Sequence, residues 1–522
     1  MKKIFYTLFI ICLLIQICNG QTTFSKRYTN NPLTIWGSSI AADDSFFYIN
    51  GEGESYIDGF PYITVFFLKT DLNGNQLLVK QIESQNIYEA WLPGYHSYFE
   101  IADENSLFAA VVYGQWDTLF PLYEELAGVI VKYNTEGDTL FTKRFKGDGY
   151  TGFFDLAIDP VTKDVFAVGA TRDTTIFDLY NYTVKIDSAG NTIYETKNGN
   201  GIFDEVGYNI NYFKDGAAVQ SGTIDNDLFT LLHTDGTLHK IDAGGNTYFS
   251  KVIGNPDKDD GGLHAIVSSN KKYFYAEQAI DTIINADDDL YPYTIIKMDT
   301  SGNKIWQTIF NGPEQSPRFW NLKQKKNGNI IGIGNKIIGG VSDYFGYVCE
   351  LDTNGNLLWE RTYNTDPAYD AYLFDMVETA DGYLVFSGSA IDFAEGVSGQ
   401  KAWLLKLDSM GCLVPGCDET AIINPPVNNA ALFTIYPNPI TNSSIVEINI
   451  PENFQVIPGE KLGLNIYDIA GKLVDSYSNI TVHNPNEVIR FNLYKKNLAG
   501  GIYSAALIYG GNNLGAILIV IE

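Results

Sequence analysis

The chain has 522 residues, of which 45% are hydrophobic and 14% aromatic, and this composition excludes a disordered or collagen-like protein. Lys and Arg number 35 against 62 Asp and Glu, so the formal net charge is −27, a field that repels nucleic-acid phosphates and anionic lipid. The 34 Tyr, 31 Phe and 49 Gly favour a β-rich fold with many turns.

The first 20 residues have the pattern of an export signal. Two lysines precede an apolar run over residues 4–17, and small residues before Gln21 offer a cleavage point after Gly20. A membrane anchor is one alternative, but the run is short for a spanning helix. A lipoprotein signal that acylates Cys18 is another, but the residue before that cysteine is too bulky. We expect a signal peptide over 1–20 and no transmembrane segment after its removal.

A seven-fold repeat follows, and it predicts one large domain over residues 21–418. Each copy is a β-rich run, then Lys-x-Asp-x-x-Gly-Asn or a variant of it, then another β-rich run, as in LKTDLNGNQLLVKQI. Each copy predicts a β-hairpin in which the Asp bonds its own backbone and the Gly takes a left-handed conformation. Asn134 takes the place of Asp in the second copy, and the other turn residues are Asp71, Gly74, Asp187, Gly190, Asp242, Gly245, Asp299, Gly302, Asp352, Gly355, Asp408 and Gly411.

The repeat predicts a seven-bladed β-propeller. About four short strands fit in each repeat of roughly 55 residues, the size of one propeller blade. The last copy lacks its fourth strand, and FSKRY over residues 24–28 matches the fourth strand FTKRF of the second copy. We expect residues 24–28 to close the ring and remove its open edges. Large side chains four residues after the turn glycines are expected to pack between blades: Leu78, Phe141, Tyr194, Phe249, Trp306 and Trp359.

Neither catalytic nor metal-binding nor cofactor-binding residues stand out. The spacings CxxC, HExxH and GxSxG are absent, and there are five His. The repeats resemble the quinoprotein type, whose blades also carry a turn glycine and a docking tryptophan. Those enzymes use vicinal cysteines, whereas Cys349 is alone and is expected to be buried, so we expect no cofactor. Export makes a disulfide between Cys412 and Cys417 possible.

The chain changes character after the cysteines. Residues 419–430 are Pro- and Asn-rich and predict a linker, and 431–522 predict a small β-domain. FTIYPNP, LNIYDIAGKLV and NLAGGIYSAALIYGG follow one another there. This segment resembles the type A C-terminal sorting domain of type IX secretion cargo, known from Bacteroidota. The motif residues are Tyr436, Pro437, Asn438, Pro439, Tyr467, Asp468, Gly471, Gly501 and Tyr503.

The resemblance implies an immunoglobulin-like β-sandwich that the outer-membrane translocon reads as an address. It implies a protein that is secreted or attached to the outer cell surface after passing through the periplasm. The alternative is an ordinary immunoglobulin-like accessory domain without an address.

Three functions remain for the propeller. The first is the binding of extracellular glycan or protein, which the loops LPGYHSYFE, YGQWDTLFPLYEE and INADDDLYPY favour because they mix aromatics with acids. The second is a polysaccharide-active hydrolase or lyase, whose carboxylate pair a sequence cannot locate. The third is a structural surface-layer or adhesive component. We expect binding rather than catalysis.

Overall fold

The structure is a computed structural model in which strands are the regular elements of the described residues. Two compact units divide the chain, residues 1–411 and 412–522. The signal-cleavage site at Gly20 and Gln21 and the linker 419–430 lie outside the described residues. Described are residues 23–521 except 30–34, 58–59, 83–88, 95–97, 117–122, 148, 173–177, 200–203, 226–233, 256–259, 281–291, 311–316, 338–343, 365–368, 393–399, 414–416, 418–432, 451–460, 468–472, 485–486, 496–497 and 510–511.

Seven antiparallel sheets lie within the described residues of the first unit. The first sheet is β2 (Ile35–Ala42), β3 (Phe46–Ile57), β4 (Phe60–Asp71) and β5 (Gln76–Gln81). The second is β6 (Glu89–Pro93) and β7 (Phe99–Asp103), both paired to β8 (Ser106–Trp116), then β9 (Tyr123–Asn134) and β10 (Thr139–Phe145). The third is β11 (Thr151–Ile158), β12 (Val165–Arg172), β13 (Leu179–Ile186) and β14 (Thr192–Asn198).

The remaining sheets repeat this order. The fourth is β15 (Glu205–Lys214), β16 (Ala217–Asp225), β17 (Thr234–Ile241) and β18 (Thr247–Ile253). The fifth is β19 (His264–Val267), β20 (Tyr273–Ala279), β21 (Tyr293–Asp299) and β22 (Lys304–Phe310). The sixth is β23 (Arg318–Gln324), β24 (Ile330–Ile337), β25 (Tyr344–Leu351) and β26 (Leu357–Tyr363). The seventh is β27 (Tyr369–Glu378), β28 (Leu384–Asp392), β29 (Gln400–Leu407) and, out of chain order, β1 (Phe24–Tyr28).

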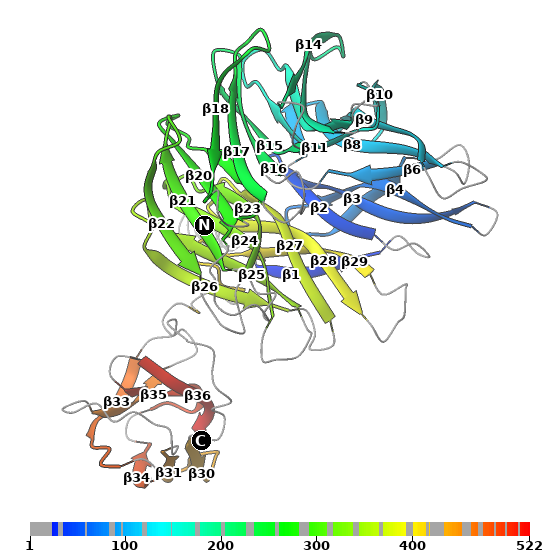
Figure 1. Cartoon of the computed structure of the whole chain (residues 1–522). Coiled ribbons are helices and arrows are strands. Elements are labelled where there is room, and N and C mark those ends of the chain that lie inside the picture. The colour runs from blue at the N-terminus through cyan, green and yellow to red at the C-terminus, as the bar shows by residue number, and fades with distance from the viewer. Residues whose placement is uncertain are drawn as a thin grey trace, which may run out of the picture. The chain divides into compact units, whose positions relative to one another are not determined.

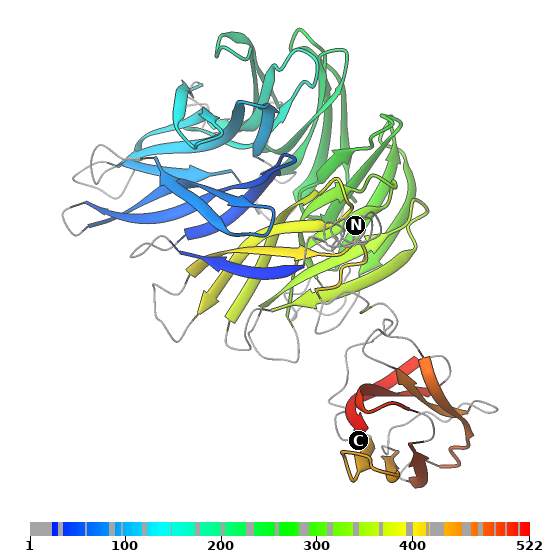
Figure 2. The ribbon, with the colours of Figure 1, turned by 180° about the vertical axis from the view of Figure 1, so that it is seen from behind.

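Each sheet packs on the next one along the chain. The strand β11 contacts β8 and β9, β15 contacts β11 to β13, β19 contacts β15 and β16, β23 contacts β19 and β20, and β27 contacts β23 to β25. The strand β2 of the first sheet contacts β27, β28 and β29 of the seventh. Figures 1 and 2 show the sheets following one another in colour order, with blue β1 beside yellow β29. This arrangement is that of a β-propeller.

The aspartate turns join the third strand of a sheet to its fourth. Asp352 Oδ1 accepts the backbone N–H groups of Asn354 (2.8 Å) and Asn356 (2.9 Å), and its Oδ2 accepts the side-chain amide of Asn356 (2.8 Å). The Gly355 N–H donates to the Asp352 carbonyl, and the glycine has φ +86°. Only a residue that tolerates positive φ can close this turn, which is why the sequence places glycine there. The same carboxylate bonds recur at Asp71, Asp187, Asp242 and Asp299, and Asn134 makes them with its side-chain amide.

The turn glycines also receive a ring from the neighbouring sheet. A Cβ on Gly355 would lie 2.8 Å from ring atoms of Trp306, on the last strand of the preceding sheet. Phe141 lies in this way against Gly190, Tyr194 against Gly245 and Trp359 against Gly411. The second copy differs, because Phe67 of β4 takes the place beside Gly137, and Leu78 packs against the adjoining apolar core.

The strand β1 makes the contacts of an ordinary fourth strand. All five of its residues pair with β29, from Phe24 opposite Lys406 to Tyr28 opposite Ala402. The Tyr28 hydroxyl donates to the Gly74 carbonyl at 2.7 Å, as the Tyr363 hydroxyl does to the Gly411 carbonyl at 2.7 Å. The Phe24 ring lies against Gly74, where a Cβ would be 2.6 Å away.

The second unit holds two sheets with a shared apolar core. One sheet is β30 (Phe433–Tyr436), β31 (Ser443–Asn449) and β34 (Val488–Tyr494); the other is β33 (Leu473–Ile480), β32 (Leu462–Tyr467), β35 (Gly501–Tyr509) and β36 (Asn512–Ile521). Alternate residues of β31 and β32 are buried, so each sheet has one inward face. The core includes Val446 and Ile448 from the first sheet and Leu464, Leu507 and Ile519 from the second.

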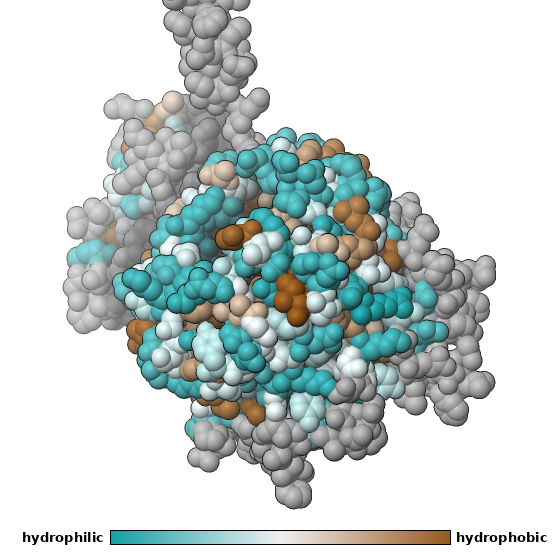
Figure 3. Space-filling view, turned by 90° about the horizontal axis from the view of Figure 1, so that it is seen from above, coloured by the Kyte–Doolittle hydropathy of each residue, from teal (hydrophilic) through white to brown (hydrophobic). Residues whose placement is uncertain are grey.

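One face of the molecule shows how polar and apolar residues are distributed on it. The face in Figure 3 is largely hydrophilic, with hydrophobic residues in small separate groups. Among the described residues no helix is long and apolar enough to cross a membrane.

Candidate functional site

A cavity of about 1090 Å³ is lined by residues from all seven sheets of the first unit. The lining comes chiefly from the first residues of the first strands and the last residues of the second strands. Because neighbouring strands run in opposite directions, this end of each sheet is opposite the end with the aspartate turns. The aspartate turns therefore lie at one end of the sheets, and the cavity lies at the other end.

Aromatic rings dominate one part of the lining. Trp36 of β2 and Trp320 of β23 each contact Phe374 of β27, with ring centroids 5.7 Å and 5.8 Å apart. Tyr372 stacks on Phe374, and Trp320 Nε1 donates to Asn335 at 2.5 Å. The two tryptophans are half-buried, so their indole rings are held by packing and still reach the cavity. Rings held in this way offer flat apolar surface to a ligand at little cost in conformational entropy.

Several ionisable side chains line the cavity beside these rings. Glu277 of β20 lies directly opposite His264 of β19 in the strand register. Burial raises the pKa of the Glu277 carboxyl to about 8, although the nearby Arg318 guanidinium lowers it. Burial and then the Glu277 charge raise the pKa of Tyr293 to about 12. Arg318 stacks over the Trp320 ring at 4.2 Å from its centroid.

Two further charged residues line the cavity. Arg172 ends β12, and Glu52 lies in β3. Burial and then the neighbouring Glu54 raise the pKa of Glu52. With Glu277 protonated near neutral pH, the lining holds two guanidinium groups against one carboxylate whose ionisation is itself disfavoured.

Buried polar residues tie the first strands together. Five of these strands carry a register shift, and the residue after it is buried and polar: Ser39, Asp155, Asn209, Asn321 and Asp375. Asp375 Oδ2 accepts the Ser39 hydroxyl (2.7 Å) and the Ile40 N–H (3.1 Å) from β2. Its Oδ1 accepts Lys323 Nζ of β23 at 2.9 Å.

A buried aspartate also joins the third sheet to the fourth. Asp155 Oδ2 accepts the Asn209 amide at 2.6 Å and the Ile210 N–H at 2.9 Å. These carboxylates join one sheet to its neighbour through buried hydrogen bonds. We therefore assign the Asp155 and Asp375 carboxylates a structural role and not a catalytic one.

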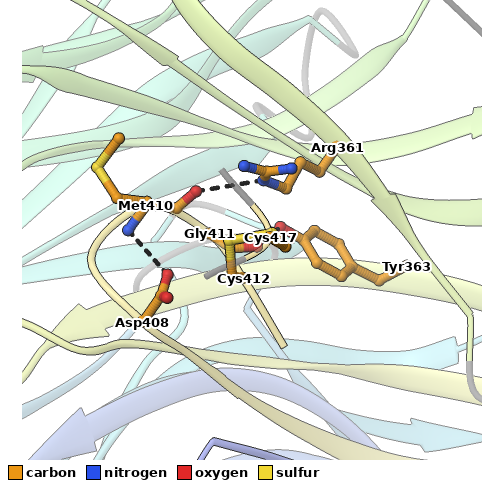
Figure 4. The surroundings of a disulfide bond; sticks show 7 residues. All are labelled: Arg361, Tyr363, Asp408, Met410, Gly411, Cys412 and Cys417. Carbon is orange, nitrogen blue, oxygen red and sulfur yellow. Dashed lines mark hydrogen bonds between the residues drawn. A yellow bond between two sulfur atoms is a disulfide. The ribbon is translucent and has the colours of Figure 1, made fainter. Parts of the chain in front are cut away.

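The disulfide joins Cys412 to Cys417 directly after the last aspartate turn. Figure 4 shows the chain before it. The Met410 N–H donates to Asp408 Oδ1 at 3.0 Å, and its carbonyl accepts from Arg361 Nε at 3.2 Å. Cys349 is buried, and burial raises the pKa of its thiol.

The described sorting-motif residues lie in or beside the sheets of the second unit. Tyr436 ends β30, and its hydroxyl donates to Glu447 Oε2, which also accepts Arg490 Nε. Asn438 Oδ1 accepts the Val520 N–H at 2.8 Å. The Pro437 carbonyl accepts the Ser444 hydroxyl, Tyr467 accepts the Asn465 amide, Gly501 starts β35, and the Tyr503 hydroxyl donates to the Ala499 carbonyl. The peptide bonds before Pro437 and Pro439 are cis, and Asp468 and Gly471 lie outside the described residues.

The cavity was not found by sequence reasoning. Trp36, Glu277 and Trp320 come from three sheets, and no local spacing connects them. The loop segments that favoured binding give a partial signal, because Leu92, Pro93 and Tyr293 at their ends line the cavity. Within the described ranges, no group of three or more His, Cys, Asp or Glu side chains is placed to hold a metal ion.

Comparisons with known proteins identify the second unit. Residues 434–520 match the family described as secretion system C-terminal sorting domain. The chain therefore carries a sorting domain of type IX secretion, which implies export to the cell surface or the extracellular space. No curated protein matches the chain.

Several solved structures are similar to the chain. PorZ, an essential bacterial surface component of the type-IX secretion system of Porphyromonas gingivalis, is 12% identical over 93% of this chain and 70% of that chain, with a TM-score of 0.34. The β-propeller domain of the Trilobed protease from Pyrococcus furiosus is 8% identical (72% and 95%, TM-score 0.42), and the polysaccharide lyase Uly1 is 11% identical (72% and 90%, TM-score 0.45). At these TM-scores the likenesses carry no argument about binding or activity.

Proposed function

We propose that this protein is type IX secretion cargo with a type A sorting domain, and that its seven-bladed propeller binds an extracellular glycan. The address is residues 431–522, and the binding site is the cavity. The translocon is the first partner and the glycan the second.

The seven-bladed, closed form of the propeller is supported by its hydrogen bonds and contacts. The strand β1 fills the place of the fourth strand in the seventh sheet. Phe24 and Tyr28 reach the first turn at Gly74. The fourth-strand rings of Phe141, Tyr194, Trp306 and Trp359 reach the next turn in the same way. A ring closed in this way leaves no unpaired edge on β29.

The proposal of glycan binding rests on one observation: half-buried aromatic rings line the cavity beside guanidinium and carboxyl groups. A concave site with apolar rings and a few convergent polar groups is the usual form of a small-ligand site. The half-buried rings of Trp36 and Trp320 supply apolar surface for the apolar side of a sugar. The guanidinium groups can donate hydrogen bonds to the sugar oxygens, and the carboxyl groups can accept its hydroxyls. A site of about 1090 Å³ has room for an oligosaccharide.

A glycan array with the mature protein tests this function. The Trp36→Ala and Trp320→Ala variants are expected to lose binding, each by up to about tenfold, because an aromatic contact contributes about 0.5–1.5 kcal/mol beyond the area that it buries. Tyr248→Ala is the matched control, because this exposed ring lies on β18 and not in the cavity. A wild-type protein that binds no glycan, or variants that bind like the control, would overturn the proposal.

A second candidate is a polysaccharide-active hydrolase or lyase. It is favoured by Glu277, because a carboxyl with a pKa of about 8 is protonated at neutral pH, the state that a general acid requires. The measurement is the release of reducing ends or of unsaturated sugars from polysaccharides. Product formation that Glu277→Gln abolishes would support catalysis, and bound polysaccharide that stays intact would support binding alone.

A further inference from the structure

The Arg318 side chain is set up to receive a planar anion. Its guanidinium stacks over Trp320, 4.2 Å from the ring centroid, while the arginine itself is exposed at the cavity. Stacking restrains the plane of the guanidinium and leaves its N–H groups at the edge, where one of them bonds the Tyr293 side chain and others match the two oxygens of a carboxylate. Trp320 is itself fixed by its bond to Asn335 and its contact with Phe374.

The Glu277 carboxyl, which interacts with Arg318, does not neutralise the arginine charge at neutral pH. Glu277 has a pKa of about 8 because burial outweighs the effect of Arg318, so it is mainly protonated at pH 7. The groups that face it from neighbouring strands are His264 on β19, Tyr293 on β21 and Arg318 on β23. None of these supplies a second negative charge at that pH. Within the described residues, no hydrogen bond occupies the Glu277 carboxyl.

Building on the proposed function, we propose that the cavity recognises a uronate, a sugar that carries a carboxylate. The sugar ring packs on the aromatic rings, its carboxylate binds the Arg318 guanidinium, and the neutral Glu277 carboxyl donates a hydrogen bond to a ligand oxygen. Arg172 adds a second positive charge to the lining. A neutral sugar would leave the stacked guanidinium without the anion that it fits.

Calorimetric titration with an oligogalacturonate and with its methyl ester tests the proposal, because the two ligands differ only in the charge of the carboxyl group. Wild-type protein at pH 7 is expected to bind the acid about tenfold more tightly than the ester, the contribution of one charge-assisted hydrogen bond. Arg318→Gln is expected to remove this preference, so that the acid and the ester bind with similar affinity. Arg361→Gln, which removes a guanidinium outside the cavity, is the matched control and is expected to keep the preference.

A pH series gives an independent readout. As the pH rises past about 8, Glu277 ionises beside the bound ligand and loses the proton that it donates. Binding of the acid is expected to weaken more than binding of the ester, because only the acid also meets like-charge repulsion. Glu277→Gln cannot ionise, so this variant is expected to keep acid binding at high pH. Circular dichroism checks that both variants are folded, and the wild-type comparison of acid and ester stands without them.

The outcomes distinguish the recognition of a uronate from the broader proposal of glycan binding. Equal affinity of the wild-type protein for acid and ester, or preference for a neutral or sulfated sugar, overturns uronate recognition and leaves glycan binding standing. Failure to bind any glycan on the array overturns both. An acid preference that persists in Arg318→Gln overturns the role of this arginine.

Discussion

A turn glycine is required for two reasons: its positive φ and the close approach of a ring from the neighbouring sheet. Two glycines of this protein allow the two contributions to be measured separately. Gly355 has φ +86° and faces the Trp306 ring, whereas Gly382 has φ +85° with nothing within 4 Å of an added Cβ. Gly382→Ala is expected to cost about 1 kcal/mol from backbone strain alone. Gly355→Ala is expected to cost a further ~1–3 kcal/mol, because the methyl group displaces the indole.

Urea unfolding followed by tryptophan emission measures this difference, because all seven tryptophans lie in the first unit. Equal losses for the two variants would show that the ring contact contributes nothing, and docking between sheets would then need another explanation.

The turn aspartates are expected to lose their stabilising effect on the fold in acid. The Asn356 side chain, and then its backbone N–H, lower the pKa of Asp352 below its ordinary value of 3.8. A carboxyl with a lowered folded pKa stabilises the fold above its unfolded pKa, and this contribution is lost as the pH falls through the folded pKa. Asp352→Asn keeps the two bonds from backbone N–H groups, as Asn134 does in the second copy, and cannot titrate. Between pH 5 and 3 the variant is expected to lose less melting temperature than the wild type, and a steeper loss would contradict this account.

The turn residues and the cavity residues differ in how far the sequence predicts them. Asp352 and Gly355 are three positions apart, and their chemistry is local, so the repeat shows the turn directly. Trp36, Glu277 and Trp320 come to line one cavity only after the sheets that carry them have packed together. The raised pKa of Glu277 comes from burial, which no spacing encodes. Sequence patterns therefore locate the frame of this protein and miss its cavity.

At the scale of elements, the proposed closure of the propeller depends on the strand β1, which pairs with β29. Deleting residues 22–28 is expected to destabilise the first unit by several kcal/mol, since it removes the pairing with β29 and the Phe24 and Tyr28 contacts at Gly74. Tyr28→Phe removes one buried hydrogen bond and is expected to cost about 1 kcal/mol. A synthetic peptide of residues 23–29 should restore part of the stability of the deletion variant. Unfolding curves that coincide for wild type and deletion would refute closure by β1.

The cysteines give a second test at this scale. Cys412 and Cys417 are expected to be oxidised in the exported protein, and Cys349 to stay reduced, because it is buried on β25. Thiol labelling before and after denaturation, read by mass spectrometry, should find one thiol that reacts only in the unfolded chain. A labelled Cys412 or Cys417, or a bridge to Cys349, would show that the assignment is wrong.

At the scale of the whole molecule, the two units have separate sheets and separate cores. The first unit has its own strand pairing and cores, and the second has two sheets around another core. An address that folds by itself can be removed without unfolding the propeller or attached to another protein. The sorting motif is short-range in sequence, which is why FTIYPNP and the two segments after it predict this unit from the sequence.

The most direct test of the account is the cell fractionation of two engineered chains in a type IX-competent bacterium. A chain truncated after residue 430 is expected to accumulate as folded propeller in the periplasm. A periplasmic reporter fused to residues 431–522 is expected to reach the cell surface or the medium. Normal export of the truncated chain, or a fused reporter that stays in the periplasm, would contradict the claim that residues 431–522 are the address.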